Sequence, residues 1–267
     1  MQKKKAPVII DLEGTSFTLD IDHQQLRQTN NPGNRISFIH QMLDFGSHYE
    51  LDYNFIKCRA ALSIDLLSAV KTIEIPPLTT LDPEGMAAKY GQTVSGISGK
   101  PDFEVIVDQQ ALDLRRQGVL PQINIAGEIY TVNLRAEELR PTSGQAPVLH
   151  LSQFTISADS QRLEAYFHPL SKMLVSVDPK LTELPDYAVK ISIPQETALD
   201  PVAAAGIYGL IQRNVLRRDG LCIHHEATVI PLHDTDLPAL IQQNREQLKA
   251  EHQANAAKLK PRQHYRL

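Results

Sequence analysis

The stretch Ile73–Gly91 reads IEIPPLTTLDPEGMAAKYG, and it decides the fold because it occurs a second time. Ile191–Gly209 reads ISIPQETALDPVAAAGIYG, which is identical at ten of 19 positions. In each copy a short run rich in isoleucine ends at proline, and an Asp-Pro pair follows. Aspartate is a preferred N-cap residue, and proline suits the first position of a helix. Both copies therefore predict a strand and then a helix that begins after Asp82 or Asp200.

A second repeated block lies upstream in each copy. Ile10–Arg27 and Ile123–Arg140 share five identities over 18 positions, and apolar residues alternate with polar ones around a glycine in both. This pattern predicts a β-hairpin whose turn contains Gly14 or Gly127. Because the two blocks recur in the same order, we infer a tandem duplication. The inferred parts are a basic N-terminal tail, two repeats, and a polar, basic C-terminal helix or tail, at residues 1–6, 7–118, 119–243 and 244–267.

Comparison of the two copies extends the prediction of secondary structure. Further strands are expected in pairs, one from each copy: Ile36–Leu43 with Leu149–Ile156, His48–Tyr53 with Arg162–Phe167, Ala60–Ile64 with Met173–Val177, Thr72–Ile75 with Lys190–Ile193, and Phe103–Val107 with Ala227–Leu232. The second Asp-Pro helix is expected to continue to about Arg218, and final helices are expected over Gln109–Gln117 and from Leu237 onward. The predicted fold class is α+β: a tandem duplication of a mostly antiparallel β-rich module with two helices per copy, plus a projecting C-terminal helix.

Composition limits the classes of protein to consider. The 267 residues carry a net charge of −4, and no window approaches the roughly 18 apolar residues that a membrane helix needs. Positive charge gathers at the ends, since residues 1–5 carry three lysines and residues 244–267 have a net charge of +4. Cys58 and Cys222 form neither a CxxC pair nor a disulfide framework. We therefore expect a cytoplasmic protein with reduced thiols and no membrane association.

Complete catalytic signatures are absent from the sequence, including Gly-rich phosphate loops, the nucleophile elbow and the HExxH zinc motif. The nearest approach to a site is Cys222–His233, which contains a cysteine, three histidines and Glu226. Zinc binds such side chains. Neighbouring side chains of an extended chain point to opposite sides, so His224 and His225 cannot both join Cys222 at one ion. The sequence therefore predicts no catalytic residue, no metal site and no cofactor.

Arg27 and Arg140 are candidate binding residues because they occupy matching positions in the two copies. Two guanidinium groups presented in this way could bind a carboxylate or a phosphate. The alternative is structural: each arginine ties the loop after its hairpin to a neighbour such as Asp82 or Asp200.

Arg213, Arg217 and Arg218 are the remaining candidates. Their helical spacing gathers positive charge on a helix, which is the strongest basic group expected within the folded body. The alternative is a favourable interaction with the negative C-terminal end of that helix.

The C-terminal segment is expected to form a helix from Leu237 to Leu259. Its apolar stripe is thin, and Asn255 interrupts it between Leu248 and Leu259. From about Gln243 onward, we therefore expect an exposed helix or a disordered tail with few contacts to the body. A docking helix for a partner, or for a second copy of the chain, is the functional interpretation of this segment.

Three classes of function remain open at this point. The favoured one is a non-catalytic adaptor or binding protein, built from two pseudo-symmetric copies of one module, that docks a protein partner or a second copy through the inter-module cleft or the C-terminal helix. The first alternative is a hydrolase or transferase whose site residues are dispersed along the sequence. The second is a nucleic-acid accessory protein that uses its basic ends.

Overall fold

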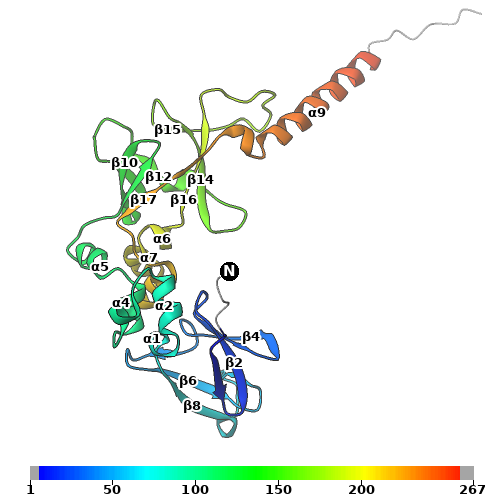
Figure 1. Ribbon diagram of the computed structural model, residues 1–267. Helices are drawn as coiled ribbons and strands as arrows, with labels where there is room; N and C mark the ends of the chain where they lie inside the picture. Colours follow the sequence, from blue (N-terminus) through cyan, green and yellow to red (C-terminus); the bar gives the residue numbers. More distant parts are fainter. Residues whose placement is uncertain (1–5, 259–267) are drawn as a thin grey trace, which may run out of the picture. The chain divides into compact units, whose positions relative to one another are not determined.

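The computed structural model describes residues 6–258, with side chains up to Gln253 (Figure 1). The chain divides into two compact units. Unit 1 contains the described residues up to Gln117 together with Ala204–Leu221. Unit 2 contains Gly118–Ala203 and the described residues from Cys222 onward. Residues 204–221, which the sequence analysis assigned to the second repeat, thus belong to the same compact unit as the first.

Unit 1 contains two antiparallel sheets. In the first, four strands pair in chain order: β1 (Ile9–Leu12), β2 (Thr15–Asp20), β3 (Gln25–Gln28) and β4 (Asn31–Ser37). In the second, a central strand pairs with three others: β6 (Tyr49–Asn54) with β5 (Leu43–Asp44), β7 (Arg59–Ala60) and β8 (Val70–Ile75). The inner face of β6 presents Tyr49, Leu51 and Tyr53, all at most 1% exposed, to the core.

Unit 2 also contains two sheets. The first has the order β12 (Leu149–His150), β11 (Glu138–Pro141), β10 (Glu128–Asn133), β9 (Gln122–Ile125) and β17 (His224–Glu226), of which β17 pairs with β9 in parallel. The second has the order β13 (Thr155–Ile156), β14 (Arg162–His168), β16 (Val189–Pro194) and β18 (Thr228–Ile230), and β15 (Met173–Val175) pairs with β14.

The same pairing order occurs in both units. Strands β9 to β12 pair as β1 to β4 do, and β14 pairs with β13, β15 and β16 as β6 pairs with β5, β7 and β8. The two hairpins match in detail, since Gly14 and Gly127 each follow a residue of positive φ and each donates its N–H to a side chain three residues earlier. A duplicated module would have this arrangement, and the duplication remains an inference.

Both predicted Asp-Pro helices begin where the sequence indicated. Helix α2 (Pro83–Lys89) follows Asp82, whose carboxylate accepts from the Gly85 N–H at 2.9 Å. Helix α7 (Pro201–Tyr208) follows Asp200, whose carboxylate accepts from the Ala203 N–H at 3.1 Å. The other helices are α1 (Leu78–Leu81), α3 (Val94–Ile97), α4 (Asp102–Ile106), α5 (Gln109–Arg116), α6 (Glu196–Leu199), α8 (Gln212–Asp219) and α9 (Leu237–Lys258). Short 3-10 turns span Leu67–Ala69, Leu134–Ala136, Leu151–Gln153 and Leu232–Asp234.

The predicted continuous helix from Pro201 to about Arg218 is wrong. Helix α7 ends at Tyr208, and α8 begins only at Gln212. Gly209 lies between them with a φ of +64°, a left-handed conformation that ends a helix and that glycine adopts without steric cost. The Leu210 N–H then turns back to the Ala205 carbonyl at 2.9 Å.

The predicted strand Phe103–Val107 is also wrong, because this segment forms helix α4. Its N-terminal residue, Asp102, is 2% exposed. The carboxylate accepts from the N–H groups of Leu78 and Thr79, which open α1, and from the Tyr49 hydroxyl at 2.6 Å. The segment predicted to match Phe103–Val107 is Ala227–Leu232, which contains strand β18 (Thr228–Ile230), so the two predicted repeats differ after their Asp-Pro helices.

Several predicted strands are shorter than expected, among them Met173–Val177, which is paired as Met173–Val175, and Ala227–Leu232, which is paired as Thr228–Ile230. Ile36–Leu43 is interrupted after Ser37, whose hydroxyl accepts from the Ile39 and His40 N–H groups and turns the chain. In Leu149–Ile156, a 3-10 turn separates β12 from β13. In Ala60–Ile64, strand β7 ends at Ala60, the Ala61 N–H still donates to the Asp52 carbonyl at 2.7 Å, and the residues after it form a loop. Within the described residues, no helix has both the length and the apolar character to cross a membrane.

The buried carboxylate of Asp102 gives a stability prediction. Substituting Asp102→Ala leaves three donors unpaired in the interior, which we expect to lower the free energy of unfolding of unit 1 by about 3–5 kcal/mol. Urea denaturation measures this loss, and Glu104→Ala, an exposed acidic neighbour on the same helix, should change it by less than about 0.5 kcal/mol. Equal effects of the two substitutions would contradict the role given to Asp102.

Candidate docking surface

A loop of unit 1 exposes a concentration of large apolar side chains. It connects β7 to β8, and we call residues 61–69 the apolar loop. Leu62 is 53% exposed and Ile64 82%, while Leu66 and Leu67 are 77% and 89% exposed. Single exposed leucines are common on protein surfaces, but a contiguous group of this size is typical of an interaction site.

Asp65 holds the apolar loop in place. Its side chain has no exposed surface and accepts from Lys57 at 2.8 Å, from Arg59 at 2.9 Å and from the Leu62 N–H at 2.9 Å. The hydrogen bond from Lys57 keeps the pKa of Asp65 well below its usual range. Because the polar side chain points inward, the apolar side chains on either side of it are directed toward solvent.

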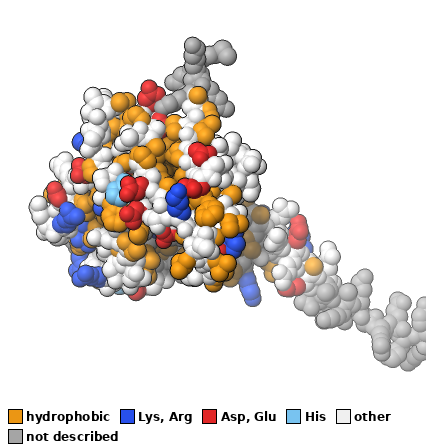
Figure 2. All heavy atoms as spheres, turned by 90° about the horizontal axis from the view of Figure 1, so that it is seen from below, with side chains coloured by type: hydrophobic (Ala, Val, Ile, Leu, Met, Phe, Trp, Pro, Cys, Tyr) orange, Lys and Arg blue, Asp and Glu red, His pale blue; other side chains and the backbone are white. Residues whose placement is uncertain are grey.

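The charges beside the apolar loop are already paired. Lys57 and Arg59 bind Asp65, and Lys71 binds Glu13 at 2.6 Å. The loop is also continuous with an apolar turn, since the Phe55 N–H donates to the Ala69 carbonyl and Phe55 is itself 40% exposed. Figure 2 views the structure from the side of β6 and β8 and shows apolar side chains over much of that face, with charged groups scattered between them.

The matching loop of unit 2, residues 176–188 between β15 and β16, is covered by a helix. Leu237 and Leu240 of α9 pack with Val177, Leu181 and Leu184 of this loop. Leu237 is only 3% exposed. The two loops thus hold apolar residues at the same place in the sheet, and the unit 2 loop shows how such a surface is buried.

Polar groups complete this helix-on-loop contact. The Asn244 side chain donates to the carbonyls of Pro179 and Leu181, each at 2.9 Å, and the Arg245 guanidinium donates to the Thr182 carbonyl at 2.7 Å. A loop has unpaired backbone carbonyls, and amide or guanidinium groups on a helix can satisfy them.

The outer part of α9 agrees with the expected exposed segment. Apart from Asn244, the described side chains from Gln242 to Gln253 are exposed, and Leu248, at 42%, is the one large apolar residue among them. Figure 1 shows α9 extending away from the sheets of its own unit. Leu259, which the sequence analysis placed on the same stripe, lies outside the described residues.

Arg27 and Arg140 each bind an acidic neighbour on their own hairpin. Arg27 on β3 forms an ion pair with Asp20, and Arg140 on β11 binds Glu138 at 2.7 Å. These contacts tie side chains within a hairpin, and they make both guanidinium groups less available to an external anion. Their role in binding remains a prediction.

The three arginines of α8 do not form a free basic patch. Arg217 is 2% exposed, and its guanidinium lies 3.2 Å from Asp44 and 2.9 Å from the Gln24 side-chain oxygen. Arg213 binds the same Asp44 carboxylate at 2.9 Å, and Arg218 binds Asp219 at 2.7 Å. A buried, paired guanidinium such as Arg217 cannot contact a ligand in solvent.

The Cys222–His233 segment does not gather its side chains at one point in the described structure. Cys222 donates to the His224 carbonyl at 2.8 Å, and Glu226 accepts from Asn124. His225 faces inward, its ring Nε2 lies 3.1 Å from the Leu199 carbonyl, and burial lowers its pKa.

A groove of about 700 Å³ in unit 2 is the place where an enzyme site would be sought. Its lining includes Glu164, Tyr166, Lys190 and Asp236. Lys190 binds Glu164 at 2.7 Å, and despite the opposing effect of burial this contact raises the pKa of Lys190. A lysine held protonated in this way is unsuited to act as a nucleophile or a general base at neutral pH.

Comparison of the chain with family models, with curated proteins and with solved structures gives no match. The argument for function therefore rests on the geometry of the molecule.

The contrast between the two loops gives a second stability prediction. The double substitution Leu66→Ser/Leu67→Ser removes exposed side chains and should change the free energy of unfolding of unit 1 by less than about 1 kcal/mol. Leu237→Ala removes a buried side chain of α9 that packs on the covered loop of unit 2, and it should cost about 2–5 kcal/mol. Urea denaturation of the full chain measures both, and a large loss in the double variant would show that the apolar loop is part of the core.

Proposed function

We propose that this protein is a non-catalytic binding protein that docks an amphipathic helix of a partner protein on the apolar loop of unit 1. The main support is that the apolar loop exposes four large apolar side chains while Asp65, bound to Lys57 and Arg59, holds the loop in place. The four are Leu62, Ile64, Leu66 and Leu67. Fully burying one such side chain contributes about 1.5–3 kcal/mol, so a few of them suffice for a specific complex.

The contact in unit 2 supports a helix as the docked element. There, α9 places leucines three residues apart, at Leu237 and Leu240, on the matching loop, and Asn244 follows one turn later to bind its carbonyls. A partner helix with leucines three or four residues apart and an amide or guanidinium group one turn on has the same chemistry. We therefore expect the partner protein to contain a helix with this spacing of leucines and polar side chains.

The surroundings of the apolar loop favour a protein over a lipid surface. Binding to an anionic membrane combines apolar insertion with unpaired basic side chains. Here each basic side chain is ion-paired: Lys57 and Arg59 share the Asp65 carboxylate, and Lys71 binds Glu13. A second copy of the chain is a weaker partner, because the described part of α9 beyond its own contact offers a single large apolar residue, Leu248.

The other contact regions, the nucleic-acid role and the cytoplasmic location expected from the sequence are proposals with less support. The inter-module cleft and the C-terminal helix stay proposed contact regions, and the described outer part of α9 offers one large exposed apolar side chain, Leu248. A nucleic-acid role would depend on the basic ends, because the arginines of α8 are paired with Asp44 and Asp219. A cytoplasmic location fits the two free thiols, Cys58 and Cys222.

A peptide experiment tests the proposal. A fluorescein-labelled peptide with the α9 sequence of residues 236–253 is titrated against the full chain and followed by fluorescence anisotropy. We expect saturable binding that the double substitution Leu66→Asp/Leu67→Asp weakens at least tenfold, because it places two charges in the apolar contact.

The matched control is Leu248→Asp, which changes an exposed leucine outside the apolar loop and should leave the peptide affinity unchanged. A scrambled peptide of the same composition should not bind. Equal peptide affinity of the wild-type chain and the loop variant would contradict the proposal, since binding would then occur elsewhere.

A further inference from the structure

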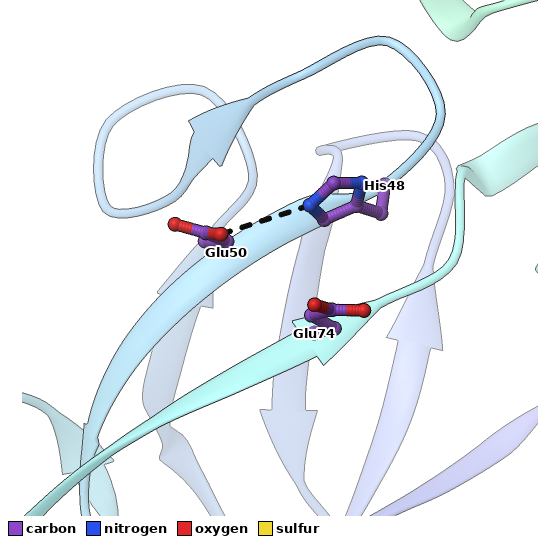
Figure 3. Close-up of side chains that lie close together, drawn as sticks. All are labelled: His48, Glu50 and Glu74. Carbon is purple, nitrogen blue, oxygen red and sulfur yellow. Dashed lines mark ion pairs between the residues drawn. The ribbon is translucent and has the colours of Figure 1, made fainter.

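Three metal-ligating side chains meet on the outer face of the second sheet of unit 1. Glu50 on β6 and Glu74 on β8 are directly opposite each other in the antiparallel register, and His48 lies two residues before Glu50 on the same face. One ligand atom from each of the three residues lies within 4.8 Å of the others. Figure 3 shows all three projecting from the same side of the two strands, and His48 Nε2 lies 3.7 Å from a carboxylate oxygen of Glu50.

The imidazole of His48 is held in an orientation suited to metal binding. Its Nδ1 lies 3.0 Å from the Ser47 hydroxyl, and its ring stacks on Phe45 with centroids 5.1 Å apart. The other nitrogen, Nε2, is the one that faces the Glu50 carboxylate. A hydrogen bond at one ring nitrogen commonly orients a ligating histidine so that the second nitrogen binds the ion.

The two carboxylates lack a positive partner. Like charges directly opposite on neighbouring strands destabilise a sheet. In the described part of the chain, Glu74 forms no ion pair, and Glu50 has only the histidine. A divalent cation between them would replace this repulsion with attraction.

The matching place in unit 2 supports this interpretation. There Glu164 on β14 is opposite Ser192 on β16, so the second carboxylate is missing, and Lys190 neutralises Glu164 at 2.7 Å. Arg162 stands two residues before Glu164, where unit 1 has histidine. Unit 2 thus supplies its own cations on this face, whereas unit 1 presents a nitrogen ligand and two uncompensated oxygen ligands.

We propose that His48, Glu50 and Glu74 form a binding site for a zinc ion. Zinc accepts one imidazole nitrogen and two carboxylate oxygens in tetrahedral geometry, with water in the fourth position. Bond lengths of about 2.0–2.2 Å require the ligand atoms to approach one another by roughly 1 Å, which side-chain rotation provides. The imidazole disfavours calcium and magnesium, which prefer all-oxygen ligand sets. The site does not depend on the proposed docking function.

Equilibrium dialysis of the full chain against chelator-buffered zinc tests the site. We expect saturable binding at His48, Glu50 and Glu74, with affinity reduced at least about tenfold in His48→Gln and in Glu74→Gln. The control is Glu164→Gln, the corresponding carboxylate of unit 2, which should bind zinc as the wild-type chain does.

Absence of saturable zinc binding by the wild-type chain would overturn the proposal. So would binding that is unchanged in His48→Gln and Glu74→Gln, because the ion would then lie at another site such as the Cys222–His233 segment. An equal loss in Glu164→Gln would also overturn it, since the effect would not be specific to unit 1.

Discussion

The buried guanidinium of Arg217 is the contact on which the organisation of the chain depends. A charge in the interior is costly unless ionic and hydrogen-bonding partners surround it. Asp44 and Gln24 provide these partners, the Tyr49 ring lies against the guanidinium at 5.1 Å, and Gln24 also donates to the Arg217 carbonyl. Helix α8 is therefore fixed within unit 1, although it comes late in the chain. The segment after it returns to unit 2, where β17, β18 and α9 complete that unit.

The position of α9, the last described helix, explains the difference between the apolar loop of unit 1 and the matching loop of unit 2. Both units contain a central strand flanked by three others and an apolar loop after the third strand. In unit 2, α9 covers that loop, whereas in unit 1 no described helix does, and Leu66 and Leu67 stay exposed. Because a helix buries this surface in unit 2, we propose that a helix of a partner protein buries the matching surface in unit 1. The same comparison, between Glu50 of unit 1 and Glu164 of unit 2, supports the proposed zinc site, because Glu164 has a lysine partner and, among the described residues, Glu50 has none.

The features that were predicted correctly depend on residues that are close together in the sequence. The hairpins at Gly14 and Gly127 and the Asp-Pro helix starts follow from local backbone preferences, and all are present. The failures involve contacts between distant residues: Asp102 becomes the partner of α1 only after folding, and Glu74 meets Glu50 only through strand pairing. Part of the apolar loop falls in the predicted strand Ala60–Ile64, which the sequence analysis pairs with Met173–Val177 of the second copy. Periodicity does not reveal that Asp65 faces inward and that the apolar residues therefore face outward.

Site-specific photo-crosslinking from the apolar loop tests the central claim most directly. A photoreactive phenylalanine analogue replaces Leu66 in the cells that produce the protein, and the crosslinked peptides are mapped by mass spectrometry. The account predicts crosslinks concentrated in one segment of a partner protein whose leucines recur at helical spacing, and none to that segment when the analogue replaces Leu248 instead. Crosslinks confined to the chain itself, or the same partner segment from both positions, would contradict it.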